Sequence, residues 1–194
     1  MGIQTILLNE VPAASQLLRQ GLQAAGHEVV AEQDPGEDLL AAVQRHAPRL
    51  LVLNLRTANA ILLGRIAELN RVQPLAVVLF VEVDRRELLE RVMQCGVSAY
   101  VVDGLQSERI EPIVNTALAR FALMSGLRRE LADTRQVLAG RKAIDRAKGV
   151  IMARRGCTED EAYSRLRKLA MDRNQRMAEV AENVVATAAL FEAS

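Results

Sequence analysis

The sequence predicts an α/β fold, in which a doubly wound, parallel five-stranded sheet is followed by a long helix and a unit of three helices. The first observation is that five short apolar runs alternate with helical patterns. Parallel strands need crossover helices, and a parallel sheet is covered on both faces. The second is an apolar heptad pattern without Gly or Pro between Leu127 and Ala139. The third is a basic segment, a turn and a capped helix near the C-terminus.

The predicted strands are residues 5–8, 29–31, 50–55, 76–81 and 99–102. Helical patterns cover residues 12–25, 37–46, 58–71 and 85–95. Gly26 and Gly96 stand where two of these helices end, and Pro12 stands in a first turn, where proline is tolerated. The sheet domain is therefore predicted to span residues 1–107.

A long helix is predicted from about residue 108, with a coiled-coil dimerisation segment over residues 108–140. Placing Ile110 at heptad position a puts apolar side chains at six of the nine seam positions from Ile113 to Arg141. The predicted dimerisation residues are Ile113, Ala117, Met124, Leu127, Leu131 and Leu138. The alternative is a single amphipathic helix packed back on the sheet, which we expect of its first two turns in any case.

Residues 141–194 predict a small three-helix unit. Its first helix, about residues 141–154, continues the coil and ends at Gly156. Thr158 and Glu161 have the spacing of a capping box, which opens a second helix running to about residue 171. Asn174 is predicted to cap a third helix that ends near residue 190. Its expected buried face consists of Met177, Val180, Ala181, Val184 and Ala188.

Composition excludes several classes of protein. No apolar run approaches the roughly 20 residues of a membrane span, and the first ten residues do not resemble a signal peptide, so we expect a cytoplasmic protein without a membrane partner. Cys95 and Cys157 are far apart and fit neither a disulfide framework nor a metal site. The sequence offers no Gly-rich phosphate loop, nucleophile with an adjacent base, or metal-ligand cluster. We therefore predict a non-enzymatic protein with no metal and no cofactor.

Charge is unevenly distributed along the chain. Residues 141–194 carry 11 basic and 8 acidic side chains, whereas residues 1–140 carry 14 and 16. All three lysines, Lys142, Lys148 and Lys168, belong to the C-terminal group. A modest basic patch is the expected electrostatic mark of a nucleic-acid site, although this excess is too small to imply binding by charge alone.

The segment from Arg141 to Ala170, RKAIDRAKGVIMARRGCTEDEAYSRLRKLA, resembles the ANTAR domain of antiterminator proteins. The resemblance implies sequence-selective RNA binding. The matching residues are Ala147, Lys148, Gly149, Ile151, Met152, Arg155, Gly156, Glu161, Ala162, Tyr163, Leu166, Arg167, Ala170, Val180 and Ala181.

Helical spacing selects the candidate RNA contacts. Arg141, Lys148 and Arg155 recur every seven residues and lie within a stripe roughly 40° wide, which can follow a phosphate backbone. Arg165 and Lys168 project from the second helix, so that both helices can bracket a groove. Tyr163 is either a base-stacking side chain or part of the small core. The predicted RNA-binding residues are Arg141, Lys142, Arg146, Lys148, Gly149, Arg155, Tyr163, Arg165 and Lys168.

The sheet domain resembles the flavodoxin-like receiver of response regulators, in particular at GVSAYVVDGL, residues 96–105. The residues that receivers use for phosphotransfer are replaced. Only one acidic residue remains of the acidic pair, a neutral side chain replaces the acceptor aspartate and another the hydroxyl residue, and an aspartate stands in place of the lysine. We therefore expect a pseudo-receiver that is not phosphorylated and is controlled by a partner protein. The degenerate positions are Asn9, Glu10, Asn54, Val81 and Asp103.

Pseudo-receiver, coiled coil and ANTAR domain in this order resemble the NasT/AmiR-type antiterminators over essentially the whole chain. The segments YVVDGLQSERIEPIVNTALARF and RKAIDRAKG look closest to the NasT group. The resemblance implies a homodimer that binds paired stem-loops in a leader RNA and so prevents a terminator from forming. It also implies a cytoplasmic, NasS-like nitrate or nitrite sensor as partner. A DNA-binding regulator with a degenerate receiver is the alternative, and a flavodoxin-like enzyme is a distant third.

Overall fold

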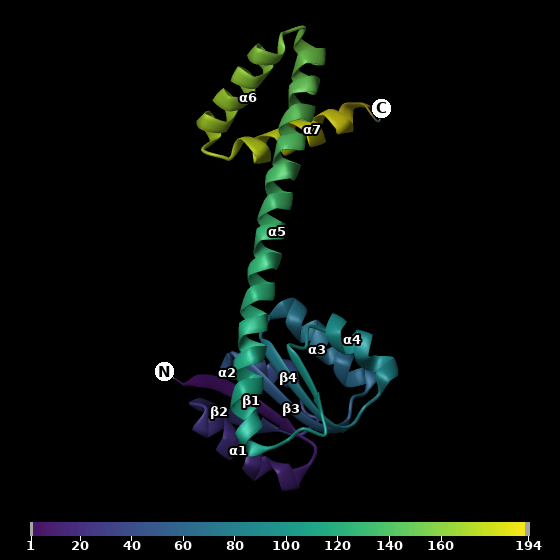
Figure 1. Ribbon diagram of the computed structural model, residues 1–194. Coiled ribbons are helices and arrows are strands. Elements are labelled where there is room, and N and C mark those ends of the chain that lie inside the picture. Colours follow the sequence, from purple (N-terminus) through teal and green to yellow (C-terminus); the bar gives the residue numbers. More distant parts are fainter. Residues whose placement is uncertain (1, 193–194) are drawn as a thin grey trace. The chain divides into compact units, whose positions relative to one another are not determined.

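The computed structural model describes residues 2–192, apart from the side chains of residues 86 and 190–192. The chain folds as two compact units, Met1–Ser125 and Gly126–Ser194, which we call the sheet unit and the helical unit. Helix α5, Ser107–Arg155, passes from the first into the second, and the division falls within the segment predicted as a coiled coil (Figure 1). No helix within the described part is long and apolar enough to cross a membrane.

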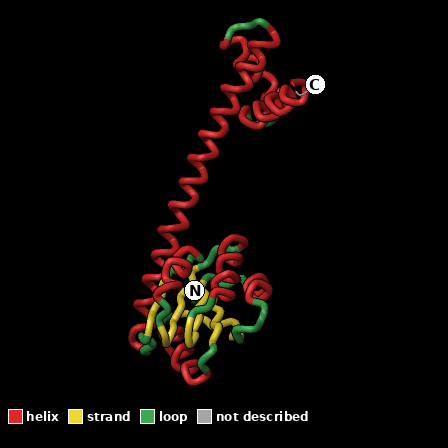
Figure 2. The backbone as a smooth tube through the Cα atoms, turned by 90° about the vertical axis from the view of Figure 1, so that its right-hand side faces the viewer, coloured by secondary structure: helices red, strands yellow, loops and turns green. Residues whose placement is uncertain are grey.

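The sheet unit confirms the predicted fold class. Its five parallel strands lie in the order β2-β1-β3-β4-β5, the doubly wound order of flavodoxin-like folds. Figure 2 shows the strands in yellow, grouped together with helices around them. The strands are longer than predicted at several ends, because polar residues continue the ladder beyond the apolar runs. They are β1 Ile3–Asn9, β2 His27–Gln33, β3 Leu50–Thr57, β4 Ala76–Val83 and β5 Ala99–Val102.

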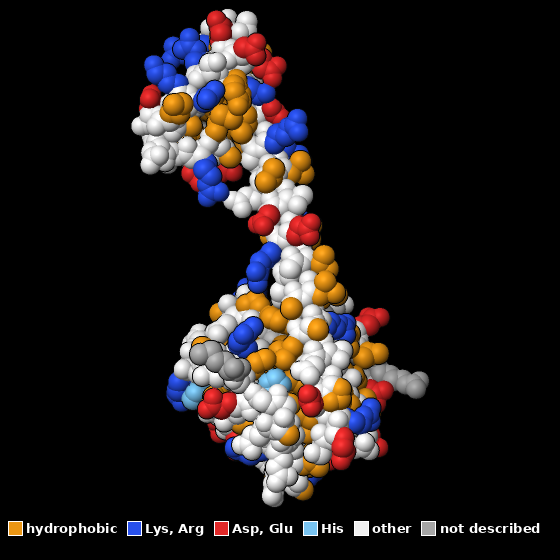
Figure 3. Space-filling model, turned by 60° about the vertical axis from the view of Figure 1, so that its left-hand side comes forward, with side chains coloured by type: hydrophobic (Ala, Val, Ile, Leu, Met, Phe, Trp, Pro, Cys, Tyr) orange, Lys and Arg blue, Asp and Glu red, His pale blue; other side chains and the backbone are white. Residues whose placement is uncertain are grey.

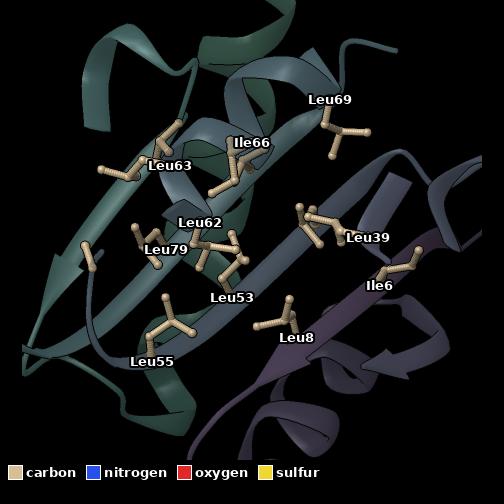
Figure 4. Packing of buried hydrophobic residues seen from close by; sticks show 14 of the residues in the cluster. Ile6, Leu8, Leu39, Leu53, Leu55, Leu62, Leu63, Ile66, Leu69 and Leu79 are labelled. Carbon is tan, nitrogen blue, oxygen red and sulfur yellow. The ribbon is translucent and has the colours of Figure 1, made fainter. Parts of the chain in front are cut away.

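Helices cover both faces of the sheet. One core combines β1, β3 and β4 with α2, α3 and α4, and Figure 4 shows its leucines interdigitating between helix and strand. The other combines the opposite side chains of these strands with α1 and the start of α5. Gly26 and Gly96 adopt positive φ at the ends of helices, as predicted. The helices are α1 Ser15–Ala24, α2 Leu39–His46, α3 Ala60–Val72 and α4 Leu89–Gln94, and η1 Pro12–Ala14 and η2 Arg86–Leu88 are short 3₁₀ turns.

The first turns of α5 belong to the sheet unit. Ile110, Val114 and Ala117 are completely buried against the sheet, and Ile113 packs on the same cluster. Ala117 therefore has to be removed from the predicted dimer seam, because a side chain that is fully buried in its own domain cannot contact a second chain. Ile113 is only partly buried, so its place in the seam stays a prediction. The exposed large hydrophobic residues of α5 begin at Leu123.

The helical unit contains the end of α5, α6 Glu159–Arg173 and α7 Met177–Glu192. Gly156 adopts a φ of +61° where α5 ends. The predicted capping box is present, because the Glu161 backbone N–H donates to Thr158 Oγ1 at 3.4 Å and the Thr158 N–H donates to Glu161 Oε2 at 3.0 Å. The buried core of the helical unit is small and consists of Ala147, Leu166, Ala170, Val180 and Ala181.

One predicted cap is wrong. Asn174 does not open α7; it is the left-handed residue that ends α6, with a φ of +50°. Its backbone N–H donates to the carbonyl oxygen of Met171 at 3.1 Å. Asparagine tolerates this conformation as well as it serves as an N-cap, so the residue type alone does not distinguish the two ends of a helix. The predicted inner face of α7 is confirmed, since Val180, Ala181 and Ala188 are buried.

Candidate nucleic-acid interface

The degenerate receiver residues gather at the carboxyl edge of the sheet. Asn9 and Asn54 are partners in the β1–β3 register, and both side chains are buried. The Asn54 Nδ2 donates to Asn9 Oδ1 at 2.8 Å, and the same oxygen accepts the Val11 backbone N–H at 3.2 Å. The two amides therefore satisfy each other and leave no carboxylate at either position.

Glu10 and Asp103 complete this edge. A Glu10 carboxylate oxygen accepts the backbone N–H of Arg56 at 3.0 Å, so it is engaged in holding the β3 end. Asp103 follows β5 with a φ of +45°, and together with Asn54 and Val81 it lines a cavity of about 250 Å³. An acidic side chain in this place repels a phosphoryl group rather than neutralising it.

The helical unit holds the larger hollow, an open groove of about 510 Å³ between the end of α5, α6 and α7. Buried or half-buried apolar residues such as Ile151, Leu166 and Val184 form its floor. Asn183 and Thr187 of α7 add an amide and a hydroxyl to one wall. We call this hollow the basic groove, because cations from two helices surround it.

Three predicted RNA contacts meet in the basic groove: Arg155 from α5, and Arg165 and Lys168 from α6. Arg154 and Arg173 also line it and were not predicted. Among the described lining residues, Asp172 is the one carboxylate. Among the side chains that the structure describes, Arg155, Arg165, Lys168 and Arg173 have no ion-pair partner. Basic and hydrophobic side chains adjoin on the visible face of the helical unit (Figure 3).

Lys148 behaves differently from its neighbours in the predicted stripe. Its Nζ lies 2.8 Å from Asp145 Oδ1 and 2.7 Å from Glu159 Oε1, and only 16% of its side chain is exposed. The hydrogen bond to Asp145, then that to Glu159, raises the pKa of Lys148. Since Glu159 begins α6, this lysine joins two helices of the unit. Any RNA phosphate that contacted it would compete with two carboxylates.

The remaining predicted contacts lie outside the basic groove. Arg141, Lys142 and Arg146 are exposed on α5. Gly149 is also exposed, and a Cβ built there meets nothing within 4 Å among the described residues, so no other helix of this chain explains the glycine. Tyr163 is 42% exposed, which removes the core interpretation and leaves its ring accessible. On α6 it stands on a different side from Arg165 and Lys168.

Sequence reasoning missed four groove residues: Arg154, Arg173, Asn183 and Thr187. Arg154 Nη2 donates to the carbonyl oxygen of Ala188 at 3.4 Å and so connects α5 with α7. The polar pair on α7 is spaced i, i+4, and the Thr187 hydroxyl donates to the Asn183 carbonyl oxygen at 2.7 Å. This spacing next to a buried face was the available signal, but it does not reveal which helices the residues face.

Comparison with known proteins places these features in context. Residues 132–185 match the ANTAR domain. The transcriptional regulatory protein PdtaR of Mycobacterium tuberculosis is 28% identical over 170 residues, which cover 88% of this chain and 83% of that protein. The nitrate regulatory protein of Klebsiella oxytoca is 37% identical over 84 residues, which cover 43% of this chain but only 20% of that protein.

Among solved structures, a CheY-like response regulator receiver domain from Methanospirillum hungatei is similar to this chain. It has a TM-score of 0.55 and 14% sequence identity, and the match covers 64% of this chain and 99% of that chain. At this identity the similarity shows the fold alone. It agrees with the strand order of the sheet unit.

Proposed function

Because the chain is an ANTAR-type regulator of the transcription antiterminator family with a receiver-like first domain, we propose that it binds paired stem-loops in a leader RNA and prevents transcription termination. The observation that carries this proposal is the basic groove, where four cations without ion pairs among the described residues surround an apolar floor. Such cations gain most from a polyanion, which replaces the missing counter-charge.

The active form in this proposal is a homodimer joined through α5. Met124, Leu127, Leu131 and Leu138 stay at heptad spacing and are each about half exposed in the single chain. A second copy of the same helix would cover them, whereas the described residues of this chain do not. Each protomer would then bring one helical unit to one hairpin.

Control is proposed to come from a partner protein in the cytoplasm. The neutral Asn9–Asn54 pair and the nearby Asp103 supply neither the acceptor nor the cation that phosphotransfer needs. A nitrate or nitrite sensor of the NasS-like kind is the proposed partner. The likeness to the NasT group and the match to a nitrate regulatory protein support this choice.

The test compares the full chain on a leader RNA with two adjacent stem-loops and on the same sequence as duplex DNA, by fluorescence anisotropy at physiological salt. We expect the RNA to bind at least tenfold more tightly. The double charge reversal Arg165→Glu/Lys168→Glu should weaken RNA binding by at least 100-fold, since it places two anions beside the phosphates.

The matched control is Arg45→Glu/Arg71→Glu, which makes the same charge change at exposed positions of the sheet unit. It should alter RNA affinity by less than threefold. Tighter binding of the duplex DNA would favour the alternative, a DNA-binding regulator with a degenerate receiver. Equal losses in the two variants would show that only net charge matters.

A further inference from the structure

The basic groove combines an apolar, a polar and a cationic surface, and single-stranded RNA has groups that can bind to each of them. Its floor is apolar, from the half-buried side chains of Ile151, Leu169 and Val184. One wall carries the Asn183 amide and the Thr187 hydroxyl, and the rim carries cations from α5 and α6. Binding of the phosphate backbone would need only the cations. It therefore does not explain the apolar floor and the polar wall.

We propose that the basic groove receives one unpaired nucleotide from the loop of the bound hairpin. The base lies on the apolar floor, its edge meets Asn183, and the flanking phosphates lie among Arg155, Arg165 and Lys168. This proposal rests on the proposed RNA-binding function and deepens it. It assigns the site at which the protein recognises a base, in addition to the contacts that bind the phosphate backbone.

Size and chemistry support this occupant. A volume of about 510 Å³ lies within the range of about 300–1,000 Å³ that is typical of small-ligand pockets. Unpaired loop bases are the usual target of sequence-specific RNA recognition, because their faces and edges are accessible. An amide presents both a donor and an acceptor, and can therefore discriminate base edges.

Charge argues for a nucleotide over an apolar partner. The four cations that have no ion pair among the described residues repel each other across the groove. Asp172 is the one carboxylate among the described residues that line it. An apolar helix or a second copy of this unit would desolvate these cations without neutralising them. A nucleotide neutralises the rim and covers the floor at the same time.

The experiment uses the full chain and a hairpin selected from a pool with a constant stem and a randomised loop. Each loop nucleotide is replaced in turn by an abasic residue. We expect one abasic position to weaken binding by roughly 5- to 150-fold, an effect of the size known for the loss of one base-stacking contact in other proteins. In Thr187→Trp, whose indole fills the groove, the intact hairpin should lose affinity by a similar factor. The abasic hairpin should bind this variant and the wild type equally.

Met171→Trp is the matched control, because Met171 is 71% exposed on α6 and does not line the groove. It should bind the intact hairpin like the wild type. Asn183→Ala serves as a second probe that needs no added bulk, and it should relax the preference among bases at the identified position. Circular dichroism at the binding temperature verifies that each variant is folded.

Equal affinity of Thr187→Trp and Met171→Trp for the intact hairpin would overturn the proposal while leaving hairpin binding in place. Additive losses in Thr187→Trp and the abasic hairpin would overturn it as well, since independent effects mean separate sites. Failure of the proposed function itself looks different, because the wild-type chain would then select no hairpin from the pool over its stem duplex.

Discussion

The polar side chains of the sheet edge and of the basic groove differ in whether they have partners within the protein. At the sheet edge, Asn9 and Asn54 are buried and hydrogen-bonded to each other. Around the basic groove, Arg155, Arg165 and Lys168 have no ion-pair partner among the described side chains. A hydrogen-bonded polar pair contributes to stability, whereas unmatched charge favours binding of an oppositely charged ligand. The difference is the reason for proposing that the helical unit binds RNA.

Core size separates the two units as sharply as charge does. The sheet unit has two extensive cores rich in leucine, isoleucine and valine, one on each face. The helical unit has a core in which Leu166 is the largest of the fully buried side chains, surrounded mainly by alanines and a valine. Equal local damage should therefore have unequal consequences, because the smaller core has less stability in reserve.

The largest expected effect comes from Leu166→Ala, which should cost about 2–5 kcal/mol and unfold the helical unit while the sheet unit stays folded. Leu53→Ala should cost a similar amount in the sheet unit and leave that unit folded. The chain has two tyrosines and no tryptophan, so urea unfolding can be followed at Tyr163 in a Tyr100→Phe background, and the reverse.

Met171→Ala is the surface control on the same helix and should leave both transitions unchanged. If both tyrosines reported a single shared transition in all variants, the two units would unfold together. The comparison of separate cores would then fail.

An intermediate effect is expected from Leu131→Asp. Leu131 is 50% exposed in the single chain, and a carboxylate in a coiled-coil seam would be buried without a partner. The dimer should dissociate at least 100-fold more readily in sedimentation velocity. Glu130→Asp, a conservative change at the adjacent position of α5, should have no such effect. A variant that stayed dimeric would move the interface away from this seam.

The smallest effect is a pH dependence confined to the sheet unit. His27 is buried, and neither ring nitrogen has a hydrogen-bond partner among the described residues. Burial lowers the pKa of His27, with the charge of Glu111 opposing the shift. The folded state therefore favours the neutral ring. Its contribution to stability is complete above the unfolded pKa of about 6.5 and is lost as the pH falls through the folded value.

Urea midpoints at Tyr100 should decline between pH 7.5 and 5.5, and His27→Gln should flatten this decline. The midpoints at Tyr163 should change less, because both histidines of the chain, His27 and His46, belong to the sheet unit. A larger decline at Tyr163 would assign the acid sensitivity to the helical unit instead.

The five strands and the capping box of the helical unit followed from local patterns. Alternating apolar runs predicted all five strands, and Thr158 with Glu161 predicted the capping box that the structure contains. These features depend on residues that are close in sequence, and their physics is local. The same reason explains why Gly26 and Gly96 were placed correctly.

The features that the sequence did not predict depend on contacts between different helices. Spacing put Lys148 on a stripe with Arg155, but only the fold brings Glu159 to its ammonium group. In the sequence, nothing distinguishes Arg173 from other exposed charges. In the structure it lines the groove that α5, α6 and α7 form together. Asn174 was misplaced because asparagine suits both ends of a helix: its side chain can cap the start, and its backbone tolerates the left-handed conformation at the end.

The middle of α5 has a consequence for how this protein responds to its own concentration. Between Phe121 and Gly140 the helix contributes no fully buried side chain to either unit. Most of the stability of a helix in a protein comes from packing of its apolar face, so in the proposed dimer the second chain would stabilise this stretch. Dilution would then weaken this stretch by mass action, and the abundance of the protein would itself influence how firmly the middle of α5 is held.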